Sequence, residues 1–385
     1  MTTTLTASAA ADAAALPPVP ALSSLVPMDV ATRVDRVRAA VAPEADALLV
    51  TRLVNIRYLT GFSGSAALLL VTPDELLFVT DGRYGEQAEA QLRGAGVTAR
   101  IEVANSGQRE LLRAAGAGHA RIALEAEDVT WAHQRRLGTD WFPDAELVPT
   151  EHLVEQLRMV KDAGEVARIE AAAIIADHAL ARIRPLLADR VPEREIAVEL
   201  DGHMRRLGAE DRSFETIIGS GPNGAMPHAR PTGRIVGEGD LVVIDFGALV
   251  DGYCSDMTRT VMVGEPTPTQ QRMLEVVEAA QQAGVDAVAA GVGVAAIDAA
   301  CRSVIDDAGW GEAFLHATGH GVGLEIHEPP RVGATGDATL APGHVVTVEP
   351  GVYLPDHGGV RIEDTVVVTT DGCRPLTHTS KRSAL

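Results

Sequence analysis

The chain has few cysteines and few aromatic residues. Its 385 residues include three cysteines, Cys254, Cys301 and Cys373, which lie far apart and form no CxxC pair. An odd, scattered set of this kind argues against a disulfide framework and against a cysteine zinc site. We therefore expect reduced thiols and a cytoplasmic protein. Aromatic residues make up only 3% of the chain, so alanine, valine and leucine must fill its cores.

Long apolar runs and an excess of basic residues are also missing. No apolar stretch reaches the roughly 18–20 residues that span a bilayer. The first 32 residues contain no Lys or Arg, so the charged start of a signal peptide is absent. Acidic residues outnumber basic ones 53 to 33, which gives a net charge of -20. Nucleic acids and anionic membranes require a basic surface, so neither is expected as the main partner.

The chain divides into a tail and two predicted domains. Residues 1–28 are rich in Ala, Thr and Ser, and Pro17, Pro18 and Pro20 interrupt any helix there, so we expect a disordered tail. In residues 29–150, apolar strand-like runs alternate with helical segments and turn signals, which predicts an α/β domain. The strand-like runs are Ala47–Leu53, Ala66–Val71, Leu76–Thr80 and Val97–Val103.

Residues 151–380 form the second predicted domain, in which helices precede and interrupt a set of strands. The segments with helical spacing are Glu151–Val160, Gly164–Leu187, Pro192–Leu207, Thr269–Ala290 and Val294–Ala308. The glycine-rich stretch Gly319–Gly323 lacks the spacing and the preceding strand of a dinucleotide-binding turn. No nucleotide site is therefore predicted.

A predicted hairpin around Asp251-Gly252 contains two aspartates. This dipeptide is a strong turn signal, and it joins the strand Leu241–Gly247 to the returning strand Tyr253–Val263. Asp245 follows four apolar residues in the first strand. Burying an unpaired carboxylate there costs several kcal/mol or forces its protonation. A bound metal ion would remove that penalty.

The register of this hairpin places Asp245 and Asp256 on one face. If the residues on either side of the turn pair, Asp245 lies opposite Thr258, and Asp256 lies opposite Gly247. Diagonal neighbours on one face are roughly 7–8 Å apart, so both carboxylates can reach one cation. For Asp256 alone, a solvent-facing position at a strand end is an equally good interpretation.

Three histidines, His316, His320 and His327, fall within twelve residues. Each one alone is more typical of a surface position or of a satisfied core position than of a ligand. Together, among glycines that let the backbone approach closely, they favour a functional site. The HExxH pattern of zinc peptidases is absent, so such a site must be assembled from distant segments.

Two glutamates follow apolar runs near the end of the chain. Glu349 ends the run that begins at Val345, and Glu363 follows a similar run after Gly359. In a hairpin closing around Pro355–Gly358 they can lie opposite each other, where they would repel unless a cation lies between them. An oxygen-rich ligand set suits Mn²⁺, Co²⁺ or Fe²⁺ better than a sulfur-type zinc site. Two bridging carboxylates can hold two ions roughly 3.5–4 Å apart with a hydroxide between them.

The dispersed motifs, taken in order, resemble those of the pita-bread-fold metallopeptidases, and within them the Xaa-Pro peptidases, aminopeptidase P and prolidase. The N-terminal segments are similar to the creatinase-type N-terminal domain of the same proteins. The resemblance covers roughly residues 30–380. The motifs that show it are Asn55–Ser65, Asp81–Tyr84, Met226–His228, Ile244–Gly247, Ser255–Thr260, Gly319–Gly323, Ile326–Glu328, Val348–Gly351 and Arg361–Asp364.

The resemblance implies an α/β (α+β) fold in which a creatinase-type N-terminal α/β domain precedes a pita-bread domain with a curved antiparallel sheet flanked by helices. It implies two divalent metal ions, with Mn²⁺ expected first and Zn²⁺ among the alternatives. Asp256 and Glu363 would bridge the two ions. The implied metal ligands are Asp245, Asp256, His320, Glu349 and Glu363.

The resemblance also implies roles in catalysis and substrate binding. His228 and His327 would hold the scissile carbonyl, Glu349 would move the proton, and His316 would bind substrate. Arg361, close to the metals, would take part in both catalysis and substrate binding. These roles predict an exopeptidase that cleaves Xaa-Pro bonds by attack of a metal-bridging hydroxide.

Two alternatives remain open on the sequence. One is an Xaa-Pro dipeptidase that does not cleave longer peptides. The other is a non-catalytic binding module on the same fold, which the intact ligand set disfavours. The expected partners are small peptides with proline at the second position and a second copy of this chain in a homodimer.

Overall fold

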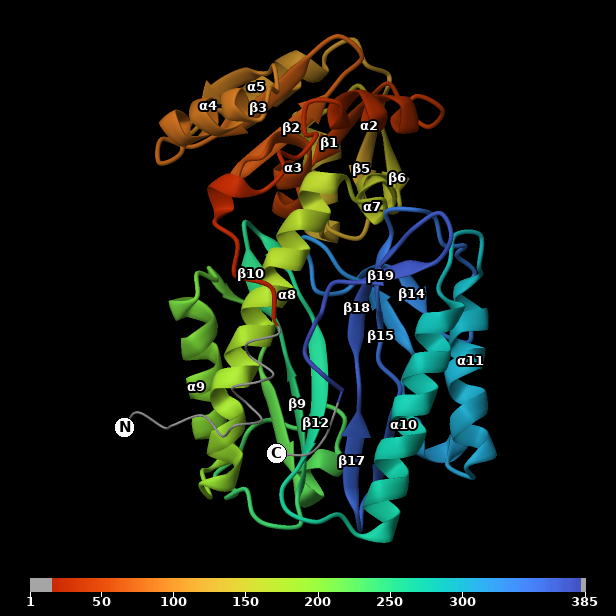
Figure 1. The fold of residues 1–385 in the computed structure, drawn as a ribbon. Coiled ribbons are helices and arrows are strands. Elements are labelled where there is room, and N and C mark those ends of the chain that lie inside the picture. The colour runs from red at the N-terminus through yellow and green to blue at the C-terminus, as the bar shows by residue number, and fades with distance from the viewer. Residues whose placement is uncertain (1–15, 382–385) are drawn as a thin grey trace. The chain divides into compact units, whose positions relative to one another are not determined.

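The computed structural model describes residues 16–381 (Figure 1). The chain forms two compact units. The N-terminal unit is Pro27–Arg158, and the C-terminal unit joins the described residues before Pro27 to those from Met159 onward. No helix among the described residues is long and apolar enough to cross a membrane.

The N-terminal unit is built on a six-stranded mixed sheet in the order β4-β3-β2-β1-β5-β6. Its core consists of apolar residues from these strands and from the helices beside them. Its strands are β1 (Ala47–Val50), β2 (Ala67–Val71), β3 (Leu76–Thr80), β4 (Arg100–Val103), β5 (Arg121–Glu125) and β6 (Glu146–Thr150). Its helices are α2 (Arg33–Val41), α3 (Leu53–Thr60), α4 (Gly85–Gly94), α5 (Gln108–Gly116), α6 (Trp131–Arg136) and α7 (Leu153–Met159).

The first strand of this unit is shorter than predicted. The sequence predicts a strand over Ala47–Leu53, whereas β1 ends at Val50 and Leu53 begins α3. The Glu125 carboxylate accepts hydrogen bonds from the backbone N–H groups of Thr51 (2.7 Å) and Arg52 (2.9 Å). These bonds satisfy donors at the start of α3. The strand therefore gives way to a helix because of a residue that is distant in the sequence.

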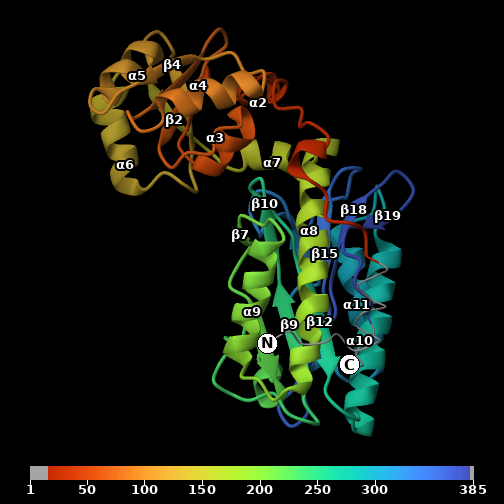
Figure 2. The ribbon, with the colours of Figure 1, turned by 60° about the vertical axis from the view of Figure 1, so that its left-hand side comes forward.

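Two helix pairs pack on the strands of the C-terminal unit (Figures 1 and 2). Helices α8 (Ala163–Ile183) and α9 (Glu193–Arg206) share a core with strands that lie between residues 217 and 262. Helices α10 (Pro268–Ala287) and α11 (Val294–Asp307) share a second core with strands that lie between residues 328 and 368. Capping boxes begin α8 at Asp162 and α10 at Thr267, which fixes where each helix starts.

The strands of the C-terminal unit form four sheets, ordered β12-β9-β8, β11-β10-β7, β14-β13-β15-β18-β19 and β16-β17. The strands in these sheets pair antiparallel, as predicted for this domain. Their bounds are β7 (Asp211–Arg212), β8 (Ile217–Ser220), β9 (Leu241–Phe246), β10 (Ala248–Val250), β11 (Tyr253–Cys254), β12 (Met257–Met262), β13 (Gly319–Gly321), β14 (Glu328–Val332), β15 (Val345–Val348), β16 (Gly351–Leu354), β17 (Gly358–Arg361), β18 (Asp364–Val368) and β19 (Cys373–Pro375).

The predicted register of the first hairpin is confirmed. Val250 pairs with Tyr253 across the turn, and Asp245 lies opposite Thr258. Asp256 itself lies in the break between β11 and β12, where the chain passes from one sheet to the other. The Asp256 carboxylate therefore lies where the hydrogen-bonded pairing of the hairpin strands is interrupted.

The second hairpin has the same kind of interruption. Val348 pairs with Asp364 in one ladder, and Gly351 pairs with Arg361 in the next. Glu349 and Glu363 lie in the break between these two ladders. Their side chains can turn out of the sheet there, as the predicted facing arrangement requires.

Part of the predicted disordered tail differs from the structure. Residues 1–15 lie outside the described part of the chain, but residues 16–28 lie within it. Val19 and Leu25 pack against the core beneath α8. His178 bonds to the carbonyl oxygen of Pro17 (2.8 Å). Apolar packing and a partly buried polar contact therefore hold this proline-rich segment, in which Leu22–Ser24 forms a short 3-10 helix.

Candidate metal centre

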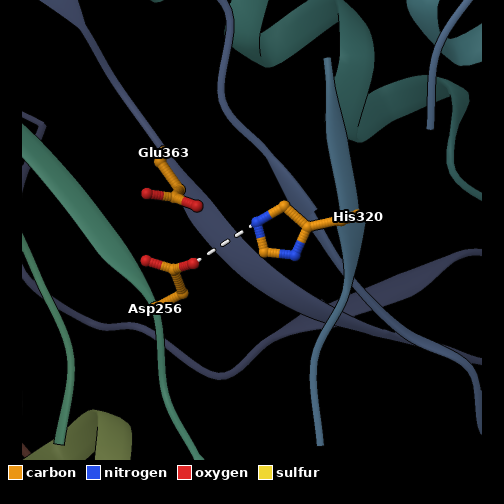
Figure 3. A group of neighbouring side chains, drawn as sticks. All are labelled: Asp256, His320 and Glu363. Atoms are coloured by element: carbon orange, nitrogen blue, oxygen red, sulfur yellow. Dashed lines mark ion pairs between the residues drawn. The ribbon is translucent and has the colours of Figure 1, made fainter. Parts of the chain in front are cut away.

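The five predicted metal ligands come together in the C-terminal unit. Three of them, Asp256, His320 and Glu363, offer ligand atoms that all lie within 4.8 Å of one another (Figure 3). His320 Nε2 is 3.5 Å from Asp256 Oδ2 and 3.4 Å from Glu349 Oε1. Asp245 is close enough to raise the pKa of Asp256, Glu349 and Glu363.

Burial and mutual repulsion dominate the electrostatics of this cluster. The pKa values of Asp256 and Glu363 are raised well above the usual carboxyl range, first because both groups are buried and then because neighbouring carboxylates repel them. Burial likewise raises the pKa of Glu349 to about 8 and lowers the pKa of His320 to about 4. Asp256, Glu349 and Glu363 therefore need a cation nearby to remain ionised near neutral pH.

The unpaired oxygens of the cluster fit a bound divalent metal. Asp245 Oδ1 and Glu363 Oε1 are buried and have no hydrogen-bond partner in the described chain. The second oxygen of each group is held, since Asp245 Oδ2 accepts from Arg361 and Glu363 Oε2 accepts from Thr258 (2.8 Å). Buried polar atoms are rarely left unpaired. Carboxylate oxygens with one imidazole form a ligand set that suits hard or borderline ions.

Neighbouring groups orient the ligands. His320 Nδ1 lies 3.0 Å from the carbonyl oxygen of Gly321, and a carbonyl oxygen can only accept a hydrogen bond. The proton is therefore on Nδ1, and Nε2 offers its lone pair to the cluster. Thr347 Oγ1 donates to Glu349 Oε1 (3.2 Å) and accepts from the His320 backbone N–H (3.1 Å).

Arg361 is buried beside the cluster, and its guanidinium N–H groups donate hydrogen bonds to protein groups. Its Nε donates to Thr258 Oγ1 (3.1 Å), and its Nη1 donates to the carbonyl oxygen of Pro227 (3.2 Å) and to Tyr353 Oη (2.7 Å). Its Nη2 donates to Asp245. The guanidinium therefore fixes several groups around the cluster and supplies one positive charge beside its carboxylates.

His316 is also held on both sides of its ring. Its Nδ1 lies 2.8 Å from the carbonyl oxygen of Ala317, and its Nε2 lies 2.8 Å from Tyr353 Oη. Burial lowers the pKa of His316 to about 4, so the ring is neutral near pH 7. A direct hydrogen bond to substrate would require the exchange of one of these contacts.

His228 and His327 are both exposed to solvent. The His327 ring is 4.4 Å from the His320 ring, measured between centroids. Partial burial lowers the pKa of His327, the charge of Asp245 raises it, and His228 lowers it again. His228 also lowers the pKa of His316. All four predicted histidines therefore lie around one cluster.

Three residues of this site are absent from the set predicted from the sequence: Thr258, Thr347 and Tyr353. Thr258 lies opposite Asp245 in the predicted hairpin, so the register could have identified it as a neighbour of a ligand. Thr347 could have been identified in the same way, because it is two residues before Glu349 on the same face of the strand. Nothing in the local pattern marks Tyr353, because its partners Arg361 and His316 come from other segments.

The raised carboxyl pKa values predict how the metal-free protein responds to pH. A carboxyl group whose pKa is higher in the folded than in the unfolded state stabilises the fold at low pH, and this stability is lost as the pH rises through the folded value. For Glu349 this window extends from its ordinary 4.5 to about 8. One pH unit between the two values corresponds to about 1.4 kcal/mol. The buried histidines His316, His320 and His344, whose pKa values are lowered to about 4 from 6.5, act in the opposite sense, but mainly below pH 7. Chelator-treated protein should therefore unfold at lower denaturant concentration at pH 8 than at pH 7.

The control for this prediction is the protein saturated with Mn²⁺, because bound cations should keep the carboxylates ionised. Its midpoint should change much less between the same two pH values. A metal-free protein that becomes more stable from pH 7 to pH 8 would contradict this interpretation of the cluster.

Comparisons with known proteins agree with this geometry. Residues 167–370 match metallopeptidase family M24, and residues 33–160 match the creatinase/prolidase N-terminal domain. The chain is 40% identical over 340 residues to the uncharacterized peptidase YqhT of Bacillus subtilis, covering 87% of this chain and 94% of that protein. These matches confirm the predicted fold class.

Two solved structures share the fold over nearly their whole length. The Xaa-Pro dipeptidase from Bacillus anthracis superposes with a TM-score of 0.88 at 38% identity, covering 92% of this chain and 99% of that one. The X-Pro aminopeptidase from Thermotoga maritima gives a TM-score of 0.84 at 35% identity, covering 91% and 99%. The names of these relatives include both a dipeptidase and an aminopeptidase.

Proposed function

Because the chain belongs to metallopeptidase family M24, we propose that it is an exopeptidase that hydrolyses the Xaa-Pro bond at the N-terminus of peptides or in dipeptides. The observation that supports this most strongly is the buried cluster of four carboxylates and one imidazole, in which two carboxylate oxygens have no partner in the described chain. Two relatives of known structure are named for Xaa-Pro cleavage.

We propose that the cluster holds two divalent ions, with Mn²⁺ expected first and Co²⁺, Fe²⁺ or Zn²⁺ as alternatives. Asp256 and Glu363 would be shared between the ions. When bound, such ions lower the pKa of a water molecule toward neutrality and polarise a carbonyl oxygen. The ligands of the proposal are Asp245, Asp256, His320, Glu349 and Glu363.

Glu349 is the proposed proton carrier. Its side chain is 17% exposed, so it lies at the open side of the cluster, whereas Glu363 is 1% exposed. Its Oε1 is oriented by Thr347. A carboxylate in this position can take a proton from the attacking water and give it to the proline nitrogen as the peptide bond breaks.

His228 and His327 are the proposed donors to the scissile carbonyl oxygen. Both are exposed to solvent, and the His327 ring lies beside the ring of His320. An N–H group from each ring would stabilise the negative charge that develops on that oxygen. His316 and Arg361 would act mainly by holding Tyr353, Asp245 and the loop before His228 in place.

The proposed function is tested by comparing the hydrolysis of peptides of different length. With Mn²⁺ bound, we expect the enzyme to hydrolyse both an Xaa-Pro dipeptide and an Xaa-Pro-Yaa tripeptide, and an Xaa-Ala dipeptide much more slowly. Product release is measured by liquid chromatography. Cleavage of the dipeptide alone would establish the narrower dipeptidase activity. Cleavage of neither proline peptide would exclude the proposed function and favour a binding module.

The expected cellular context completes the proposal. We propose that the enzyme acts on small peptides in the cytoplasm and that it forms a homodimer. Light scattering of the purified protein would test the oligomeric state, with a mass near that of one chain as the contradicting result.

A further inference from the structure

A second buried arginine, Arg259 in β12, lies behind the metal centre and has no role in the proposed mechanism. It is 3% exposed, and all five of its N–H groups are used. Nε (3.2 Å) and Nη2 (2.7 Å) donate to the carbonyl oxygen of Thr379. Nη2 also donates to Asp364 Oδ1 (2.8 Å), and Nη1 donates to the carbonyl oxygens of Thr258 (3.0 Å) and Glu363.

The backbone N–H, the carbonyl oxygen and the carboxylate of Glu363 are all hydrogen-bonded to residues of β12. The Glu363 backbone N–H donates to the carbonyl oxygen of Thr258 (3.1 Å). Its carbonyl oxygen accepts from Arg259. Its carboxylate Oε2 accepts from Thr258 Oγ1 (2.8 Å), which leaves only Oε1 without a partner in the described chain. Arg259 therefore fixes the backbone from which a proposed metal ligand projects.

The segment Leu376–Lys381 contacts both Arg259 and its partner Asp364. Thr377 Oγ1 donates to Asp364 Oδ1 (2.9 Å), and Lys381 Nζ lies 3.1 Å from Asp364 Oδ2. The backbone N–H of Leu376 donates to the carbonyl oxygen of Thr365 in β18 (2.8 Å). The segment is thus bound to the strand that follows Glu363.

Asp177 in helix α8 also binds the same segment. The carboxylate of Asp177 is fully buried and accepts from the backbone N–H groups of His378 (2.9 Å) and Thr379 (2.8 Å). It also accepts from Thr379 Oγ1 (2.6 Å). Asp177 therefore fixes the carbonyl group of Thr379, which accepts two of the five hydrogen bonds of Arg259.

We propose that Arg259 and the segment Leu376–Lys381 position Glu363 and thereby set the affinity of the centre for its metal ions. The inference rests on the proposed function only in taking Glu363 as a metal ligand. A lysine cannot replace Arg259, because one ammonium group cannot supply the planar fork of five donors. The groups behind a ligand commonly change metal affinity by about 10–100-fold when they are replaced.

The test compares Mn²⁺ binding by metal-free wild type, Arg259→Lys and Arg259→Met, measured by calorimetry without substrate. Circular dichroism checks that each protein is folded. We expect the dissociation constant to rise by about 10-fold or more in both variants. Arg374→Met is the matched control, because Arg374 forms an exposed ion pair with Glu170 in the same unit. Its Mn²⁺ affinity should stay within about twofold of wild type, as is usual for exposed ion pairs.

Asp177→Asn gives a second route if the Arg259 variants do not fold. It loosens the segment Leu376–Lys381 without touching Arg259 and should weaken Mn²⁺ binding several-fold. Folded variants that bind Mn²⁺ as tightly as wild type would overturn the inference, and so would a wild type that binds no Mn²⁺. A wild type that binds Mn²⁺ tightly but cleaves no Xaa-Pro peptide would refute the proposed function and leave the inference intact.

Discussion

Replacement of Glu349 by alanine is expected to abolish hydrolysis of Xaa-Pro peptides. The substitution removes a proposed metal ligand, which is also the carboxylate that we propose moves the proton to the leaving nitrogen. The loss of such a group lowers turnover by about 10²–10⁴-fold even when binding is kept, and weaker metal binding adds to it. Steady-state kinetics at saturating Mn²⁺ would measure kcat and KM separately.

The control for Glu349→Ala is Glu265→Ala, which removes an exposed carboxylate from the same unit. It should have the turnover of the wild type. Metal content must be measured on the same samples. Near wild-type turnover by Glu349→Ala with metal bound would rule out the assigned role of Glu349.

Removal of metal is expected to abolish activity completely and reversibly. Without cations the four carboxylates repel one another, and burial drives Asp256, Glu349 and Glu363 toward their protonated forms. Dialysis against a strong chelator should therefore leave a folded but inactive protein. Addition of Mn²⁺ or Co²⁺ should restore turnover. Full activity in chelated protein would contradict a metal-dependent mechanism.

The aspartate hairpin shows how far local sequence determines a site. Asp251 and Gly252 have φ angles of 46° and 75°, the left-handed values that this two-residue turn requires. The turn sets the register, and the register places Asp245 opposite Thr258. One dipeptide is therefore enough to predict how a proposed metal ligand is placed in its strand pair.

The rest of the site depends on segments that meet only in the folded chain. His320 in β13 faces Asp256, which lies between strands of two other sheets, and Glu349, which follows the neighbouring strand β15. Tyr353 joins Arg361 to His316. No periodicity or turn signal specifies such contacts, so these residues are either placed by resemblance to a family or not predicted at all.

The same limit explains the errors in the N-terminal region. Helix α3 begins at Leu53 because the distant Glu125 binds the backbone before it. Residues 16–26 belong to the C-terminal unit and pack on its core through Val19 and Leu25. Composition describes what a segment prefers in isolation, and tertiary contacts override that preference in both cases.

The most direct test of the proposed metal centre is the number of ions that each chain binds. Metal-free protein titrated with Mn²⁺ and examined by native mass spectrometry should bind two ions per chain, and Xaa-Pro hydrolysis should appear as the sites fill. A protein that hydrolyses these peptides with no ion bound, or that binds Mn²⁺ equally well after Asp256→Asn and Glu363→Gln are combined, would contradict the proposed centre.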